Sequence, residues 1–487
     1  MRIGQTSLVV FISKLLGAGL GFIATLAFAR IVGAEVLGVY ALILTIVGWA
    51  TFLSDLGIGG AMKKRISEDE GPGSYLTAGI LWIIGIGVVI AVGLVLAQPF
   101  VESYVGEFNQ YAPISVVWIL VPLLFIKFFY KLPLTTLGGE RRVHLVALLD
   151  PVKQGSQSLL QIGLVVLGYS LLGMLVGYAI GGIIVGILAL YFVSVRPSRP
   201  KYHHFKSLFN YAKYSWLGRL KSRIFQDIDI LILGAFAPSA AVGVYSVAWS
   251  LSRFLELFSS SIASTLFPEI SYSSTQESIE VVRGYVEDAL MYTGLIVIPG
   301  FVGGLLLAEE LMFVYGAEFM DGSTILWILI LAILVHGYQS QFVNALNGID
   351  RPDLSFRVNL VFAVLNAGLN LLLIPRYGIE GAAIASVASV TVALFLSYYY
   401  VARLLQVELP ISEITRQAAA ALLMGLIVYL AREAIEFTGV LQRNILIVLV
   451  LVGSGAAVYF VTLLTVSSQF RQTIRQNIPQ EMLDRVR

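Results

Sequence analysis

Nine of the basic residues that lie within hydrophobic runs of membrane-spanning length give the clearest chemical signal in the chain. They are Lys14, Arg30, Lys127, Lys131, Lys153, Arg219, Lys221, Arg223 and Arg253. A cation near the middle of a bilayer costs roughly 2.5–3.5 kcal/mol on insertion scales, so such residues usually face a cavity. A cavity lined by ammonium and guanidinium groups would bind an anionic group such as a phosphate.

Helical spacing groups these cations with other polar residues. Lys127 and Lys131 are one turn apart, and no acidic residue on the same predicted helix neutralises either of them. Three further sets each share a helix face: Lys153, Gln157 and Gln161; Arg219, Arg223 and Asp227; and Trp249, Arg253 and Glu256. The side chains suited to bind sugar hydroxyls are Gln157, Gln161, Trp249, Asn359 and Asn366.

Acidic residues near the cations leave a structural interpretation open. Pairs such as Asp150 with Lys153 and Arg253 with Glu256 are spaced to form ion pairs that brace helices, and Arg223 has acidic neighbours too. Lys131 could instead extend to the membrane interface. The acidic residues that could couple transport to H⁺ or Na⁺ are Asp55, Asp227, Asp229 and Glu256, although Asp55 could also cap a helix.

The composition predicts an all-α, polytopic membrane protein. Of 487 residues, 57% are hydrophobic and 13% are charged, against about 25% charged in soluble domains. Since a span takes roughly 20 residues, fourteen hydrophobic runs predict about fourteen transmembrane helices. The runs lie near 5–32, 36–60, 75–97, 113–137, 144–167, 171–195, 210–236, 240–266, 286–307, 322–347, 354–375, 380–403, 415–435 and 443–466.

Several classes of chemistry lack the residues they need. The chain has no cysteine, which excludes disulfides and zinc–thiolate sites, and its four histidines are scattered. No phosphate-binding loop or Ser-His-Asp set is present. We therefore expect no enzyme activity, no bound metal and no cofactor, with transport coupled to the membrane potential, H⁺ or Na⁺. The first hydrophobic run, which carries Lys14, is expected to be a retained helix.

Loop charges and an internal repeat predict the organisation of the chain. Lys and Arg concentrate in alternate loops, which places both termini in the cytoplasm. Gly38-Val39-Tyr40 recurs as Gly243-Val244-Tyr245, and the segment around Gly173 recurs around Gly381. We expect parallel repeats with a substrate site between them. The predicted parts are an N-terminal six-helix lobe (1–200), a C-terminal six-helix lobe (201–405), two extra helices (406–466) and a cytoplasmic tail (467–487).

The chain also resembles a known family. Ala27–Tyr40 (AFARIVGAEVLGVY), Leu53–Gly59 (LSDLGIG) and Tyr377–Ala385 (YGIEGAAIA) are similar to segments of polysaccharide transporters of the Wzx type. These belong to the multidrug/oligosaccharidyl-lipid/polysaccharide exporter superfamily. The resemblance extends over nearly the whole chain. The residues that match the family in location and chemistry are Lys14, Arg30, Asp55, Lys127, Lys153 and Arg253.

The resemblance implies a flippase of a prokaryotic plasma membrane. Its implied cargo is a polyprenyl-(pyro)phosphate-linked oligosaccharide, moved to the outer leaflet by alternating access through a cationic cavity. Membrane lipids are implied partners, as are glycan polymerases or glycosyltransferases, and nucleic acid is not. Three alternatives stay open: a multidrug or cation antiporter of the same superfamily, a lipid II flippase, or a scaffold of a polysaccharide synthase that transports nothing.

Overall fold

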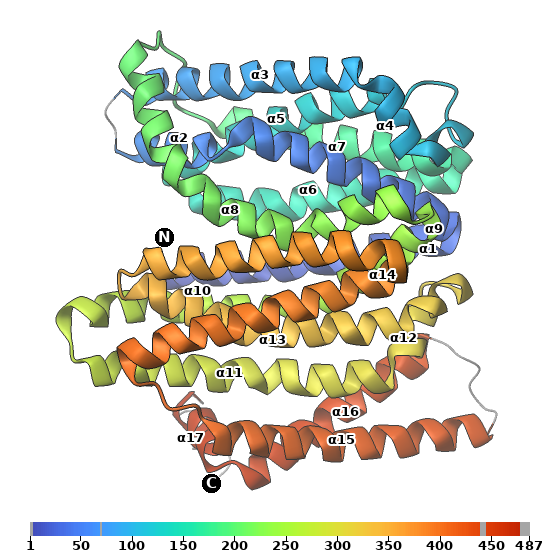
Figure 1. Ribbon diagram of the computed structural model, residues 1–487, viewed down its shortest axis with the longest axis vertical. Helices are drawn as coiled ribbons and strands as arrows, with labels where there is room; N and C mark the ends of the chain where they lie inside the picture. The colour runs from blue at the N-terminus through green and yellow to red at the C-terminus, as the bar shows by residue number, and fades with distance from the viewer. Residues whose placement is uncertain (1–2, 69–70, 439–444, 478–487) are drawn as a thin grey trace. The chain divides into compact units, whose positions relative to one another are not determined.

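The computed structural model describes residues 3–68, 71–438 and 445–477, and every regular element in these residues is helical (Figure 1). The all-α prediction is therefore confirmed. The side chains of Lys14 and Arg219 lie outside the described part of the chain, so their predicted roles stay predictions.

The helices follow one another with short connections. In the first half of the chain they are α1 (Ile3–Asp55), α2 (Ile58–Ser67), α3 (Pro72–Leu96), α4 (Gln98–Tyr104), α5 (Val117–Gly139), α6 (Val143–Leu164), α7 (Ser170–Phe192), α8 (Tyr202–Phe236) and α9 (Ser239–Arg253). In the second half they are α10 (Glu256–Gln276), α11 (Ile279–Leu306), α12 (Ala308–Phe313), α13 (Ser323–Gly348), α14 (Pro352–Leu405), α15 (Ile411–Thr438), α16 (Ile445–Val466) and α17 (Ser468–Asn477).

Glycine breaks divide three long helical segments. Gly33 interrupts α1 with a φ of 82°, and Gly378 interrupts α14 with a φ of 54°. Gly168, with a φ of 93°, lies in a short π-helical segment, Val165–Tyr169, between α6 and α7. Glycine adopts positive φ without the steric penalty of a Cβ, so the chain can redirect there. Gly168 and Gly378 lie in the two segments that the internal repeat relates.

Each of the fourteen predicted hydrophobic runs overlaps a described helix. Among the described residues, nine segments are long and apolar enough to cross a membrane, and three of these are 40, 50 and 54 residues long. Each of those three contains a glycine break and, at roughly 20 residues per span, is long enough to cross twice. The charged helix α8 forms as predicted but lies outside the nine segments.

Two boundary predictions were wrong around α10. The predicted helix 240–266 is broken after Arg253, where α9 ends, and resumes at Glu256. The predicted loop 268–285 is mostly helical, because α10 continues through Pro268 to Gln276 and α11 begins at Ile279. Pro268 is tolerated within α10, although proline removes an amide donor from the helix.

The chain forms two compact units. Unit 1 comprises Met1–Val247 and Ala367–Ala382, and unit 2 comprises Ala248–Asn366 and Ala383–Arg487. One core of unit 1 packs α2, α3 and α5 together through side chains that include Met62, Leu76 and Phe128. In unit 2, α10, α11 and α13 share a core, and α15 packs on α16 in another. Because α8 belongs to unit 1, these units divide the chain elsewhere than the predicted lobes, which stay predictions.

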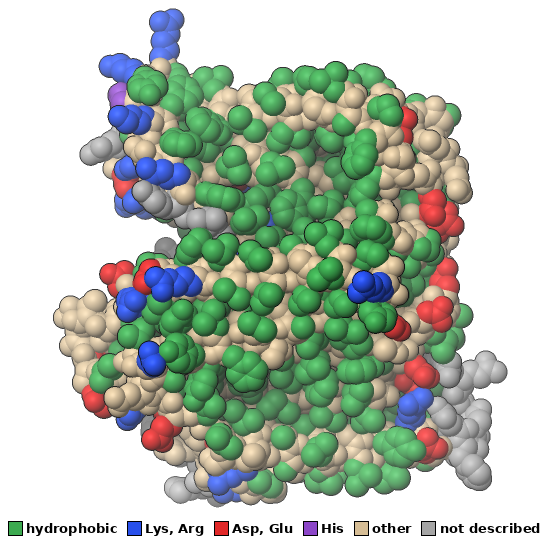
Figure 2. Space-filling view, in the orientation of Figure 1, with side chains coloured by type: hydrophobic (Ala, Val, Ile, Leu, Met, Phe, Trp, Pro, Cys, Tyr) green, Lys and Arg blue, Asp and Glu red, His purple; other side chains and the backbone are tan. Residues whose placement is uncertain are grey.

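The surface of each unit suits a membrane. Figure 2 shows hydrophobic side chains over most of the visible face, with charged side chains gathered toward the helix ends. In unit 1, Lys63 and Lys64 are exposed near the end of α2.

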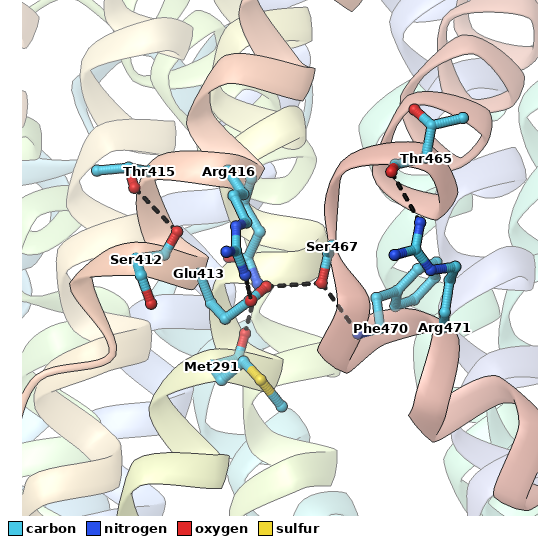
Figure 3. Close-up of polar contacts among 10 residues, drawn as sticks. Met291, Ser412, Glu413, Thr415, Arg416, Thr465, Ser467, Phe470 and Arg471 are labelled. Carbon is cyan, nitrogen blue, oxygen red and sulfur yellow. Dashed lines mark hydrogen bonds and ion pairs between the residues drawn. The ribbon is translucent and has the colours of Figure 1, made fainter.

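The last two hydrophobic helices and α17 are joined by a buried polar contact (Figure 3). Glu413 of α15 forms an ion pair with Arg416 and accepts a hydrogen bond of 2.7 Å from the Ser467 hydroxyl. The same hydroxyl oxygen accepts a hydrogen bond from the Phe470 amide of α17 at 2.9 Å. Gln417 donates to the Met291 carbonyl and so ties α15 to α11.

Candidate functional site

A basic cluster forms within unit 1, and three helices contribute to it. We define the basic cluster as Lys127 and Lys131 of α5, Lys153 of α6 and Arg223 of α8. The charges that act on the Lys127 ammonium include those of Lys131, Lys153 and Arg223, with Asp227 opposing them. The structure therefore brings together four of the cations that the sequence singled out.

Lys131 has an acidic partner that the sequence did not reveal. Its ammonium lies 2.7 Å from the Asp55 carboxylate, which comes from the end of α1. The partner of Lys131 therefore comes from another helix, as its own helix contains no acidic residue. The other oxygen of Asp55 accepts a hydrogen bond of 2.6 Å from the Gly59 amide in the first turn of α2. Asp55 thus accepts a hydrogen bond from the first turn of α2, as expected for a capping residue, and also pairs with a cation, which the sequence analysis did not anticipate.

Two other members of the basic cluster form ion pairs within their own helices. Lys153 lies 2.8 Å from Asp150, and its ammonium is 6.0 Å from the centre of the Tyr130 ring. Arg223 pairs with Asp227 at 2.6 Å. Both pairs that the helical spacing suggested are therefore formed.

Arg223 also reaches across to α1. Its guanidinium donates to the Thr45 carbonyl at 3.3 Å and lies 5.7 Å from the centre of the Trp49 ring. A Cβ on Gly48 would lie 1.9 Å from a guanidinium nitrogen of Arg223. A side chain at position 48 would therefore displace the guanidinium from this position against α1, where the Trp49 ring adds a cation–π contact.

Lys127 differs from its neighbours. Within the described part of the chain its ammonium forms no ion pair, whereas the other three members of the basic cluster each pair with one carboxylate. Four cations against three carboxylates leave one positive charge in excess. Within the basic cluster Lys127 is therefore the member best suited to bind an anion.

The two α6 amides predicted to bind sugar form hydrogen bonds to the neighbouring helix α7. Gln157 and Gln161 are buried, and their amide groups donate to the carbonyls of Tyr178 and Met174 on α7, at 3.2 Å and 2.8 Å. The close approach requires Gly181, because a Cβ there would lie 2.6 Å from the Gln157 side chain. These amides join α6 to α7. Their role in sugar binding stays a prediction.

Sequence reasoning missed three tyrosines beside the basic cluster. The Tyr130 and Tyr178 hydroxyls are hydrogen-bonded to each other at 3.1 Å, and Gln161 also donates to the Tyr40 hydroxyl at 2.7 Å. A phenol within an apolar helix usually finds a polar partner. That tendency is a signal for such residues, but it does not identify the partner.

The remaining predicted residues lie elsewhere in the two units. In unit 1, Arg30 is exposed on α1, and buried Asp229 accepts hydrogen bonds from Tyr245 at 2.5 Å and Asn370 at 2.7 Å. In unit 2, Arg253 pairs with Glu256 at 3.1 Å and Trp249 is buried. The two predicted asparagines of unit 2 are Asn359, which donates to Ser355, and Asn366, which donates to Ser389.

Comparison with known families decides the classification. Residues 3–274 match the family described as polysaccharide biosynthesis protein. The chain belongs to this family. Residues 220–372 also match the MatE family, as expected for the exporter superfamily that the sequence resembles.

Two relatives of this family member are similar to it over nearly their whole length. The first, "Probable flippase AglR" of Haloferax volcanii, is 29% identical over 99% of both chains. The second, "Probable low-salt glycan biosynthesis flippase Agl15" of the same organism, is 30% identical over 91% of this chain and 92% of its own.

Solved structures confirm the fold of this family member. The "Lipid II flippase MurJ, inward closed conformation" covers 96% of this chain and all of its own, with a TM-score of 0.78 and 16% identity. An inward-facing multidrug resistance MATE family transporter matches 79% of this chain with a TM-score of 0.63. The predicted polytopic transporter fold is therefore confirmed.

Proposed function

We propose that this chain is a flippase that moves a polyprenyl-(pyro)phosphate-linked oligosaccharide from the cytoplasmic to the outer leaflet. The observation that carries the proposal is its near full-length similarity to two proteins named as probable flippases, one of them in glycan biosynthesis. Alternating access through a cationic cavity is the mechanism we propose for it.

The basic cluster supports an anionic headgroup as cargo. Lys127 supplies a charge that no carboxylate in the described part of unit 1 offsets through an ion pair. A phosphate that binds there would complete the charge balance of the cluster, and its oxygens would accept hydrogen bonds from the ammonium. The ion-paired cations Lys131, Lys153 and Arg223 are positioned to strengthen this attraction. A cationic drug would instead be repelled by Lys127.

We propose the membrane voltage as a driving force for this reaction. An inside-negative potential contributes about 2.3 kcal/mol per charge for every 100 mV. A cargo with two negative charges that moves outward therefore gains roughly 4–5 kcal/mol at that voltage. We further propose that transport is coupled to H⁺ or Na⁺ through Asp55, Asp227, Asp229 or Glu256. The liposome assay described below tests this coupling when the H⁺ and Na⁺ gradients are varied.

The flippase proposal is tested in liposomes that contain the purified chain and a polyprenyl-diphosphate-linked oligosaccharide. A glycosidase that cannot cross the membrane cleaves only the glycans in the outer leaflet. We expect the wild-type chain to expose the inner pool to the enzyme. Lys127→Met should slow this step at least about tenfold, the loss of one charge-assisted contact, whereas the exposed Lys206→Met serves as a matched control and should behave as wild type.

Two results would contradict the proposal. An inner pool that stays protected in wild-type liposomes would mean that the chain is not a flippase for this lipid, and would favour the scaffold alternative. If Lys127→Met and wild type expose the inner glycan pool at equal rates, the basic cluster does not take part in transport. The variants Lys14→Ala and Arg253→Ala, which we also expect to abolish export, extend the test to the other predicted cations.

We further propose a prokaryotic plasma membrane location with both termini in the cytoplasm. The chain contains no cysteine, so single cysteines can be introduced without background labelling. Lys64→Cys should react with a membrane-impermeant maleimide only after the cells are opened, and Glu309→Cys should react in intact cells. The opposite pattern would reverse the proposed orientation.

A further inference from the structure

Unit 2 contains a hydroxyl-lined pocket between α10 and α13 that shares no residue with the basic cluster. Its volume is about 450 Å³, within the range of about 300–1,000 Å³ typical of small-molecule sites. Four of its lining residues are serines: Ser259, Ser260 and Ser264 of α10, and Ser340 of α13. Serine at membrane helix interfaces supports close packing or hydrogen bonding, and here these side chains line a pocket.

The fold makes room for these hydroxyl groups. Ser259 is buried against α13, where a Cβ on Gly337 would lie 2.8 Å from the serine oxygen. Gly337 therefore lets α10 approach α13 while the pocket stays open beside them. Gln341 of α13 donates to the Ser259 carbonyl at 3.1 Å and fixes the register of the two helices.

The serine hydroxyl oxygens that line the pocket can accept hydrogen bonds from a ligand. Ser260 donates to the Leu257 carbonyl at 3.0 Å, and Ser340 donates to the Gly337 carbonyl at 2.8 Å. A hydroxyl has one proton and two acceptor lone pairs. Because the proton is used within the helix, the lone pairs remain to accept hydrogen bonds from a ligand.

Asn344 and Glu256 complete the polar lining. Within the described part of the chain, the Asn344 amide makes no hydrogen bond, so both its donors and its acceptor can serve a ligand. The Glu256 carboxylate, already paired with Arg253, adds a strong acceptor. Phe267, which is 39% exposed, contributes an aromatic face. Acceptors, an amide and a ring together suit a ligand with several hydroxyl groups and an apolar face.

We propose that this pocket binds an uncharged sugar unit of the cargo's glycan, an inference that rests on the proposed flippase function. A sugar hydroxyl both donates and accepts, which matches serine lone pairs and an amide. Because the Glu256 carboxylate and the Arg253 guanidinium offset each other, hydroxyl and amide groups dominate the lining, which suits a neutral sugar better than a phosphate. Among the described residues no three His, Asp or Glu side chains gather to hold a metal ion.

The test compares two probes on the purified full-length chain by calorimetry. The probes are farnesyl phosphate and farnesyl phosphate with one attached neutral hexose, with glucose, mannose and N-acetylglucosamine used in turn. We expect wild type to bind at least one sugar-bearing probe about tenfold tighter than the sugar-free probe, a difference equivalent to about 1.4 kcal/mol. Asn344→Ala and the pocket-filling Ser264→Phe should abolish this preference and leave the affinity for farnesyl phosphate unchanged.

A matched control separates filling of the pocket from a general effect of a new ring. Thr265, the next residue on α10, is exposed and does not line the pocket. Thr265→Phe should therefore keep the preference for the sugar-bearing probe. If Ser264→Phe fails to fold, Asn344→Ala alone still decides the question, because it removes the amide without adding volume.

The outcomes distinguish this inference from the flippase proposal. If wild type binds none of the probes, the proposed function fails and the sugar pocket fails with it. If all the probes bind equally well, the pocket is not a sugar site, while the flippase proposal stands. If Asn344→Ala changes Na⁺ binding but not the preference for sugar, the pocket is a cation site and the inference is overturned.

Discussion

Gly38 and Gly243, which occupy equivalent positions in the internal repeat, pack against each other's helices in a reciprocal contact within unit 1. A Cβ on Gly38 would lie 1.7 Å from the Ser239 carbonyl oxygen, and a Cβ on Gly243 would lie 1.9 Å from the Ala34 carbonyl oxygen. Ala34 and Ser239 are themselves separated by the repeat offset of 205 positions. The contact therefore joins two segments that the internal repeat relates, and a local pseudo-twofold axis passes between them.

This contact predicts that both glycines are intolerant of a side chain. Gly38→Ala and Gly243→Ala should each lower the thermal unfolding midpoint, because overpacking of this kind costs about 1–3 kcal/mol. Gly85, at which a Cβ would meet nothing within 4 Å, provides the control. Gly85→Ala should raise the midpoint slightly, since alanine is favoured over glycine in a helix by about 0.5–1 kcal/mol. Equal midpoints for Gly38→Ala and Gly85→Ala would show that the helices can separate without cost.

The Asp55–Lys131 pair predicts a graded response to substitution. Asp55→Asn keeps an oxygen for the Gly59 amide but loses the charge, whereas Asp55→Ala loses both interactions. Loss of the capping bond should cost about 0.5–2 kcal/mol, so the unfolding midpoint should fall further for Asp55→Ala than for Asp55→Asn. Removing the orphaned cation in the double variant Asp55→Asn/Lys131→Met should restore part of the loss. A double variant that is less stable than Asp55→Asn would argue against the ion pair.

Contacts between residues close together along one helix could be predicted from the sequence, whereas contacts between distant residues could not. Hydrophobic runs predicted the helices, and local spacing anticipated the pairs Lys153–Asp150 and Arg253–Glu256, because a helix fixes neighbours three or four residues apart. Lys131 and Asp55 are separated by 76 positions, and no local pattern links them. The same limit concealed the contact of Tyr130 with Tyr178 and the packing role of Gln161.

Boundaries and pockets were harder to predict for a related reason. Serine-rich α10 reads as a loop after Pro268, yet packing of Ile270 against Phe342 and Leu346 in unit 2 keeps it helical. Tertiary burial outweighs weak local propensity in such a segment. The pocket beside α10 likewise depends on α13, whose register relative to α10 cannot be read from either sequence alone.

His204 at the start of α8 predicts a pH-dependent stability. Its imidazole is buried and accepts a hydrogen bond of 2.8 Å from the Lys201 amide. Burial lowers the pKa of His204 below its usual value of about 6.5, and the charge of His203 lowers this pKa further. Between the lowered pKa and pH 6.5 the unfolded chain binds more protons than the folded chain. The free energy of unfolding should therefore fall as the pH drops below about 6.5.

The measurement is the unfolding midpoint of the purified protein between pH 5 and pH 8. His204→Asn should flatten the dependence, because asparagine can accept the Lys201 hydrogen bond at every pH in this range. His203→Asn tests the exposed neighbour and should leave most of the dependence in place. A His204→Asn curve parallel to that of wild type would assign the effect to other groups.

We expect the two hydrogen bonds of the Ser467 hydroxyl to hold α17 against the rest of unit 2. This hydroxyl donates to Glu413 and accepts from the Phe470 amide, and the Phe470 ring stacks on Phe460 with centroids 6.1 Å apart. Ser467→Ala removes both hydrogen bonds, which should cost about 0.5–2 kcal/mol for the cap alone. Trypsin should then cleave after Arg471 several-fold faster, because cleavage requires α17 to open. Ser468→Ala changes an exposed neighbour and should leave the cleavage rate as in wild type. If Ser467→Ala and Ser468→Ala are cleaved at equal rates, α17 is held by its apolar contacts alone.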